Sequence, residues 1–180
     1  MTTDEEQAQD LPREVSQIVN VLISFDAFTI HKRYPNPSQN PTSPTTVASN
    51  LIYMTTRQDR VIGYPGAELN VKATPGDIIR WRETTLSLNF DYSALLYKFV
   101  PQSGGNLISP PEVRVAERVV PVPKNGTTDF EIQEIKDHYW TTDILKTGRV
   151  QYQFYFQLLD GKNRLGYFKW DPYITIERRI

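Results

Sequence analysis

Hydrophobic and polar residues alternate with a period of two at several places along the chain. Residues 150–158 read VQYQFYFQL, with apolar side chains at every second position and glutamine at three positions between them. Residues 18–25 read IVNVLISF and show the same alternation with one interruption. This period is typical of half-buried strands in antiparallel sheets, with one face on a core and one in water. Strands are therefore predicted at 18–25, 50–55, 68–73, 77–83, 92–100, 118–122, 129–135, 150–158, 165–170 and 174–177.

Turn residues separate these segments. Asn125-Gly126 and Asp160-Gly161 are dipeptides that tolerate the positive φ angles of tight hairpins, and most of the 13 prolines lie outside the apolar runs. About ten short strands in one chain of this size predict an all-β fold. We expect an antiparallel two-sheet β-sandwich, jelly-roll-like, with at most a short helix.

The chain divides into a tail and one domain. Residues 1–13 carry four acidic side chains and almost nothing apolar, so a mobile acidic tail is expected there, followed by a single sandwich domain over residues 14–180. Residues 31–46, HKRYPNPSQNPTSPTT, contain four prolines and no alternation. Long irregular segments are uncommon in compact domains. This one is either a proline-stiffened crossover between sheets or a loop with a functional role.

The composition removes several classes of function. With 20 Lys and Arg against 21 Asp and Glu, the net charge is −1, which argues against a phosphate-binding surface and hence against nucleic acid as a partner. The absence of cysteine excludes disulfides, thiolate chemistry and Cys-ligated metals, and two histidines cannot build a three-histidine metal site. No apolar stretch approaches the roughly 20 residues of a membrane-spanning helix. Without a secretory signal pattern at the start, we expect a cytoplasmic protein that does not bind membranes, and release without a signal peptide is the alternative.

Oxygen ligands in loops suggest a binding site. Calcium takes carboxylate and carbonyl oxygens, and such ligands often cluster in the loops at one end of a sandwich. Candidate calcium ligands stand at ends of predicted strands or in loops, although no D-x-D-x-D-G spacing is present: Asp26, Asn89, Asp91 and Asp171. Together with Asn36, these four residues form a candidate ligand-binding site, in which Trp140 could stack on a sugar ring. A lectin-like, calcium-assisted glycan-binding protein is therefore one hypothesis.

Catalysis has little support in the sequence. Asp137 and His138 are the one pairing of an acid with a histidine beside aromatic residues, but neighbouring residues of a strand point to opposite faces. No Gly-x-Ser-x-Gly elbow, Walker-type loop or dinucleotide fingerprint occurs. No catalytic residue is therefore assigned and no enzyme activity is expected. A hydrolase acting through His138 is the alternative.

Aromatic residues are abundant, with 10 Tyr, 8 Phe and 3 Trp. Tyr and Trp are enriched at protein interfaces because one end of each is apolar and the other polar. Most of them are expected in the core, but Tyr155 falls on the polar face of its predicted strand. An aromatic, glutamine-rich outer sheet face is a plausible surface for self-association, so a homo-oligomer is expected.

Four stretches together resemble a known family. They are YPNPSQNP from Tyr34, GDIIRWRETTLSLN from Gly76, DHYW from Asp137 and WDPYITI from Trp170. In this order they are similar to the AidA/PixA inclusion-body proteins of bacteria, over about residues 15–178. The resemblance implies a protein without enzyme activity that acts by self-assembly or ligand binding. It also implies quorum-sensing-dependent expression in a host-association context, and it carries no catalytic residues.

Overall fold

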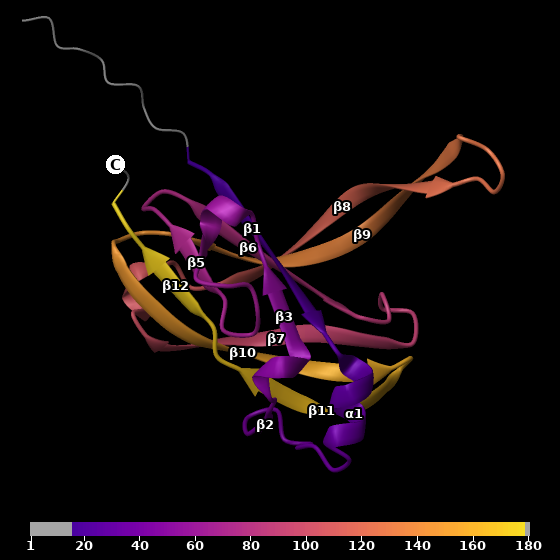
Figure 1. Cartoon of the computed structure of the whole chain (residues 1–180), viewed down its shortest axis with the longest axis horizontal. Helices are drawn as coiled ribbons and strands as arrows, with labels where there is room; N and C mark the ends of the chain where they lie inside the picture. Colours follow the sequence, from indigo (N-terminus) through magenta and orange to yellow (C-terminus); the bar gives the residue numbers. More distant parts are fainter. Residues whose placement is uncertain (1–15, 179–180) are drawn as a thin grey trace, which may run out of the picture.

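The computed structural model describes residues 16–178, so the predicted tail at 1–13 lies outside the described residues. Twelve strands, one α-helix and three short 3-10 helices make up the described chain (Figure 1). The elements are β1 (Ile18–Phe25), α1 (Ala27–Arg33), β2 (Thr45–Thr46), η1 (Ser49–Leu51), β3 (Ile52–Thr55), η2 (Gln58–Arg60), β4 (Val61–Ile62), β5 (Asn70–Ala73), β6 (Ile78–Thr85), β7 (Tyr92–Ser103), η3 (Gly105–Leu107), β8 (Glu112–Pro123), β9 (Phe130–Asp143), β10 (Gly148–Asp160), β11 (Asn163–Trp170) and β12 (Tyr173–Ile176).

The strands form two sheets, which confirms the predicted all-β sandwich with a short helix. One sheet has five strands in the order β3-β1-β6-β9-β8. The other has seven, in the order β2-β11-β10-β12-β5-β4, with β7 also paired to β10. Twelve strands rather than about ten are present because β2 and β4 have two residues each, too few to show an alternation.

The sheets are mixed rather than purely antiparallel. Strand β1 runs parallel to β6 over eight residue pairs, β12 runs parallel to β5, and β11 runs parallel to β2. In each case the two strands are far apart in the sequence, so no tight hairpin joins them. The alternation of side chains does not reveal strand direction, which explains why this feature escaped prediction.

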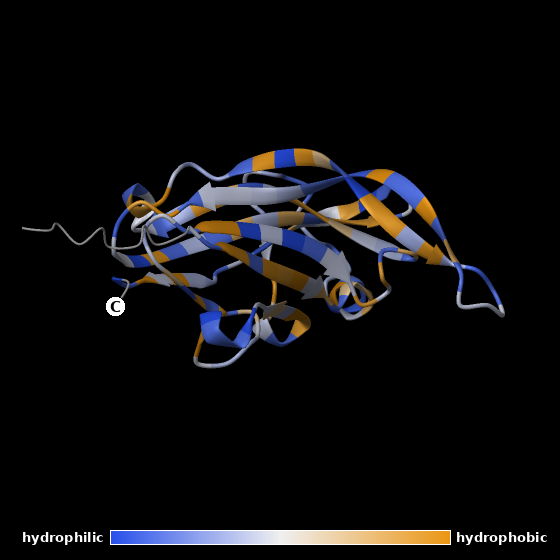
Figure 2. Ribbon diagram, turned by 90° about the horizontal axis from the view of Figure 1, so that it is seen from above, coloured by the Kyte–Doolittle hydropathy of each residue, from blue (hydrophilic) through white to orange (hydrophobic). Residues whose placement is uncertain are grey.

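The core lies between the sheets and is rich in aromatic rings. On β10, the apolar residues of the predicted alternation are all fully buried: Val150, Tyr152, Phe154, Phe156 and Leu158. Trp81 on β6 reaches across, and its Nε1 donates a hydrogen bond to the hydroxyl of Tyr152 at 3.1 Å. Figure 2 shows the two layers, with hydrophobic and hydrophilic residues alternating along the ribbons.

The proline-rich segment packs along the β11 edge of the seven-stranded sheet and reaches its outer face. The hydroxyl of Tyr97 donates to the carbonyl of Pro41 at 2.9 Å, and the backbone N–H of Tyr167 donates to the carbonyl of Ser38 at 2.9 Å. Tyr155, predicted on this outer face, does lie there, but neighbouring side chains bury it to 8% exposure. This face is thus partly covered by the chain itself, which favours the crossover interpretation of the segment.

A buried ion pair anchors the start of β6. Asp77 is fully buried and lies 2.9 Å from Nη1 of Arg60, which is itself 7% exposed. Burial alone would raise the pKa of the Asp77 carboxyl, but hydrogen bonds from Gln17 and Thr74 and the charge of Arg60 hold this pKa below its ordinary value of 3.8. Asp77, the last residue of the Pro-Gly-Asp turn predicted at residues 75–77, therefore forms a buried ion pair with Arg60.

Candidate functional site

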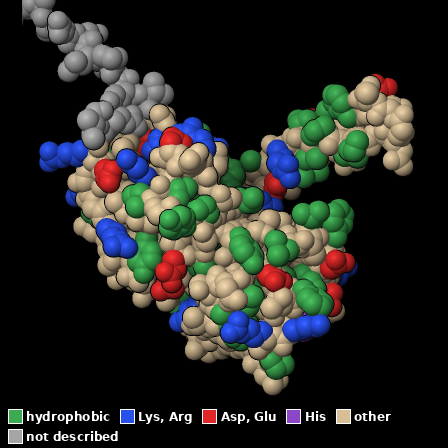
Figure 3. Space-filling model, in the orientation of Figure 1, with side chains coloured by type: hydrophobic (Ala, Val, Ile, Leu, Met, Phe, Trp, Pro, Cys, Tyr) green, Lys and Arg blue, Asp and Glu red, His purple; other side chains and the backbone are tan. Residues whose placement is uncertain are grey.

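A long hairpin extends from the sandwich and is the feature most unlike an ordinary domain surface. Strands β8 and β9 are joined by an unbroken ladder from Glu112 opposite Thr141 to Pro123 opposite Phe130. Only Trp140 to Asp143 of β9 pair with β6. Residues 113–139, here called the arm, therefore have no further strand beside them in the described part of the chain. Figures 1 and 3 show that the arm projects from the sandwich and that an open gap separates its outer part from the sandwich.

Sequence alternation indicated two short strands here, at 118–122 and 129–135. The observed strands have 12 and 14 residues because pairing between β8 and β9 satisfies the backbone even where charged residues interrupt the apolar pattern. Alternation depends on a buried face, and almost all of β8 is exposed.

One face of the arm continues the core surface into solvent. Trp140 points into the sandwich, where its ring centroid lies 5.6 Å from that of Phe154. Side chains at alternate positions of the unbroken ladder share the face of Trp140. We call the apolar residues among them the core-side face: Val113, Val115, Val119, Phe130 and Ile132. Their exposed fractions run from 46% for Val113 to 71% for Val115.

The base of the arm is held by charges. Asp137 lies 2.6 Å from Nη2 of Arg82 on β6 and 2.6 Å from Nε of Arg118 on β8. Burial alone would raise the pKa of Asp137, but the backbone N–H of His138 and the two arginines hold this pKa below its ordinary value. One carboxylate thus connects the two strands of the arm to the body.

A second contact at the base of the arm joins His138 on β9 to Glu83 on β6. Nε2 of His138 lies 2.8 Å from Oε1 of Glu83, whose side chain is completely buried. The same oxygen accepts a hydrogen bond from the backbone N–H of Leu96 at 3.3 Å. Among the described residues, the ring of His138 contacts Glu83, Arg82 and Asp137 and forms no hydrogen bond with a hydroxyl group. The imidazole therefore serves as the partner of a buried carboxylate.

The signal for Glu83 is visible in the sequence but was missed. On β6, Ile79, Trp81, Glu83 and Thr85 share the buried face, so a charged residue stands at a core position. A buried carboxylate needs a partner to offset its desolvation. Sequence position does not reveal that His138, 55 residues away, supplies it.

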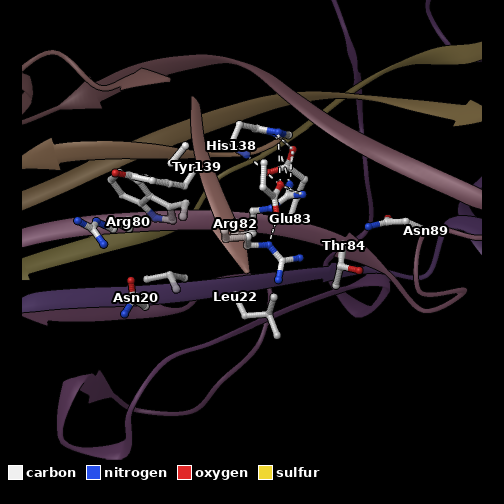
Figure 4. A pocket seen from close by; sticks show the side chains of 14 residues that line it. Asn20, Leu22, Arg80, Arg82, Glu83, Thr84, Asn89, His138 and Tyr139 are labelled. Carbon is white, nitrogen blue, oxygen red and sulfur yellow. Dashed lines mark hydrogen bonds and ion pairs between the residues drawn. The ribbon is translucent and has the colours of Figure 1, made fainter. Parts of the chain in front are cut away.

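A groove of about 590 Å³ lies between the arm and the outer face of the five-stranded sheet (Figure 4). Its walls come from β1, β6, β8, β9 and the loop before β7, and include Asn20, Leu22, Thr84 and Asn89. The guanidinium of Arg80 lies 4.8 Å from the ring centroid of Tyr139 and covers that aromatic face. The groove offers amide and hydroxyl groups for a small polar ligand, and its one tyrosine ring is already stacked.

The predicted loop ligands lie in different parts of the fold. Asp26 caps α1 and accepts a hydrogen bond from the N–H of Thr29 at 3.1 Å. Asn36 is exposed in the proline-rich segment, and Asp91 is exposed before β7. Asn89 lies in the same loop with φ at +62°, and its N–H donates to Thr85 Oγ1 at 3.1 Å. Asp171 is half-buried in the predicted break between β11 and β12.

These residues do not assemble into one cation site. Within residues 16–178, no three Asp, Glu, His or Cys side chains are grouped so that they could hold a metal ion. The three acids of the predicted calcium set are therefore not brought together. Asn89 is the one member of the predicted ligand set that lines the groove.

The expected role of Trp140 as a stacking platform is corrected by the structure. Its side chain is 7% exposed, and its Nε1 donates to the carbonyl of Leu96 at 3.4 Å. It occupies a core position because β9 is longer than predicted and its last residues join the body of the five-stranded sheet. A sugar at the surface would not reach its faces.

Fold and arm together define an all-β sandwich protein that presents an exposed hairpin. No helix within the described part of the chain is long and apolar enough to cross a membrane. Residues 17–176 match the model of the PixA family, described as inclusion body protein. The chain belongs to the PixA inclusion body protein family.

A solved structure agrees with this assignment. The crystal structure of an inclusion body protein of the PixA family from Burkholderia cenocepacia J2315 is similar to this chain at a TM-score of 0.79 and 21% sequence identity. The similarity covers 93% of this chain and 99% of the other, so the two share the fold over nearly their full lengths. The search of curated proteins found no match. The predicted family resemblance is confirmed.

Proposed function

We propose that this protein acts without catalysis, by associating with further copies of itself through the core-side face of the arm. The observation that carries the proposal is the exposure of apolar residues on this face. Val115, Phe130 and Ile132 are 71%, 59% and 56% exposed, on a hairpin that stands away from the body. Exposed apolar side chains gathered on one face of a projecting hairpin indicate an interaction site, because burying apolar surface releases about 25 cal/mol per Å².

Two observations support a second copy as the occupant. The family is described as inclusion body protein, which fits association between like chains. Strand β8 carries two Glu and two Arg, so the charges along this strand sum to zero. The arm as a whole, residues 113–139, carries four Lys and Arg against five Asp and Glu, so copies of it approach one another with little net repulsion. We expect this association to take place in the cytoplasm.

The proposal is tested by measuring mass in solution. Multi-angle light scattering of the purified protein, from micromolar to hundreds of micromolar, should show oligomers that grow with concentration. The double substitution Val119→Asp with Ile132→Asp places charges on the core-side face and should shift the protein to monomer. Both residues are exposed, so the fold should survive, as circular dichroism would verify.

Leu145→Asp is the matched control. Leu145 is 51% exposed, close to the values of the two arm residues, but it follows β9 outside the arm. This variant should associate like the natural chain. A natural chain that stays monomeric throughout, or an arm variant that associates unchanged, would contradict the proposal.

The geometry gives less support to glycan binding. The ring of Tyr139 lies beneath Arg80, and Trp140 is buried, so neither offers a free face for a sugar. Binding of glycans, with or without calcium, stays a prediction to be checked on a glycan array with and without a chelator.

A further inference from the structure

The outer edge of the arm is an open sheet edge. Strand β8 is the last strand of the five-stranded sheet and, within residues 16–178, pairs only with β9. An edge strand presents unpaired N–H and C=O groups, and natural proteins usually keep such edges short or interrupt them. β8 has 12 residues, which is long for an exposed edge.

The turn of the arm shows which residues of β8 face this edge. The N–H of Lys124 donates to the carbonyl of Asp129 at 3.0 Å. Lys124 and Asp129 therefore form a hydrogen-bonded pair in the register of the β8–β9 ladder, next to Pro123 and Phe130. In an antiparallel pair, alternate residues direct their backbone groups toward the partner strand. Even-numbered residues of β8 therefore bond to β9. The residues that direct their N–H and C=O groups to the open edge are Val113, Val115, Glu117 and Val119.

Prolines limit the part of the β8 edge that can pair with another strand. Pro121 and Pro123 also face the open edge, but they have no backbone N–H to donate. Pro111 stands at the other end, directly before β8. The edge available for pairing is therefore residues 113–119. The arm projects from the body (Figure 3), so a second chain can approach this stretch.

We propose that two copies pair antiparallel through β8, edge to edge, about a two-fold axis at Val115. This inference rests on the proposed self-association and adds a second contact to it, along the backbone edge of β8, which leaves the core-side faces free to pack on further copies. The two five-stranded sheets then form one continuous sheet. Because paired residues of neighbouring strands share a face, the two core-side faces lie on the same side of the joined sheet. Their valines form one larger apolar surface.

Charge selects the register. Three two-fold registers pair at least three of the four edge-facing residues with one another, and their axes lie at Val115, at Ala116 and at Glu117. An axis at Ala116 places Arg114 opposite Arg118 of the second copy, twice. An axis at Glu117 places two glutamates opposite each other.

The axis at Val115 avoids both conflicts. It places Glu112 opposite Arg118 of the second copy, twice, and Val115 opposite itself. Opposite charges directly across two strands are stabilising, and like charges are destabilising. The sequence of β8 therefore favours this register over its two neighbours.

The natural chain has no cysteine, so single-cysteine variants can measure the register directly. Opposite residues of a hydrogen-bonded antiparallel pair have Cα atoms about 5.5 Å apart, within the range that a disulfide spans. Val115→Cys should form a covalent dimer on mild oxidation, about tenfold faster than Ala116→Cys or Glu117→Cys. Non-reducing electrophoresis over time measures these rates. Faster crosslinking of Ala116→Cys or Glu117→Cys, or equal rates in all three, would overturn the register.

A charge reversal provides the second test. Glu112→Lys places a positive charge opposite Arg118 of the second copy and should weaken association about tenfold, measured by sedimentation velocity. Glu131→Lys is the matched control, because Glu131 lies on β9 away from the open edge, and it should leave association unchanged. Equal effects of the two reversals would count against edge pairing. Association that depends on Val119 and Ile132 but shows no register preference refutes this inference alone, whereas a monomeric natural chain refutes the proposed function as well.

Discussion

Nε2 of His138 lies 2.8 Å from Oε1 of Glu83, and this contact ties the base of the arm to the core of the sandwich. Glu83 belongs to β6 and is buried, whereas His138 stands on β9 where that strand leaves β6. The other oxygen of Glu83, Oε2, has no hydrogen-bond partner within the described chain. His138 at 2.8 Å and Nη1 of Arg82 at 3.4 Å contact the same oxygen and together offset the desolvation of this carboxylate.

Removing His138 should destabilise the fold. His138→Leu leaves Glu83 buried with few partners, and we expect the free energy of unfolding to fall by about 2–3 kcal/mol. Urea unfolding followed by tryptophan fluorescence measures this loss. The oligomeric state should be compared at the same time, since the arm depends on this base.

A double-mutant cycle separates this effect from lost packing. The variant with both Glu83→Leu and His138→Leu removes donor and acceptor together, so it should lose less stability than the sum of the single variants. Additive losses would show that the two side chains do not interact in the folded protein.

Asp77 should make the protein sensitive to acid. Its pKa in the folded state is below the ordinary value of 3.8, because hydrogen bonds and Arg60 outweigh the effect of burial. A carboxyl with a lowered folded pKa contributes stability that is fully present above the unfolded pKa and is lost as the pH falls through the folded one. Stability should therefore decline below about pH 4, and Asp77→Asn should flatten this decline.

The same substitution should cost about 2–4 kcal/mol near neutral pH, because it leaves Arg60 without its buried partner. Asp59→Asn is the control, since Asp59 also contacts Arg60 but its side chain is 63% exposed. Unfolding midpoints measured across a series of buffers give both quantities. Equal effects of the two substitutions would argue against a special role for the buried carboxylate.

Tyr97 should make the protein sensitive to alkali. Burial, followed by the neighbouring Tyr167 and Tyr155, raises the pKa of its phenol from 10.0 to about 12. A phenol with a raised folded pKa keeps its proton in the folded protein after the unfolded chain has lost it, so stability falls between about pH 10 and 12. Ultraviolet titration should show this late tyrosine, and Tyr97→Phe should remove it. Tyr64→Phe, at a residue 89% exposed, should leave the late transition in place.

A side chain at position 166 should destabilise the fold. A Cβ atom there would lie 2.7 Å from Cβ of Pro37 in the proline-rich segment, closer than packed carbons approach. Gly166→Ala should therefore lower the free energy of unfolding by about 1–3 kcal/mol. Adding Pro37→Gly removes the clash and should recover part of the loss. A stable Gly166→Ala protein would show that this segment moves away at little cost.

Local patterning was sufficient to predict the strands that border the core. The alternation in β1, β10 and β12 places one set of side chains inside, and the structure buries that set. Family membership was also predictable, because four short motifs retain their order along the chain. Patterning failed on β8 and β9, where most side chains are exposed and the backbone pairing alone maintains the strands.

The sequence by itself determined the sandwich architecture, because burial of alternate side chains is a local property that composition and spacing record. Only the tertiary structure decided that β9 leaves β6 after Trp81, that His138 meets Glu83, and that an apolar face of the arm stays in solvent. The predicted loop ligands and Trp140 were distributed among caps, turns and the core for the same reason. Contacts between residues far apart depend on how the strands cross and diverge in space, and no local pattern along the chain records that geometry.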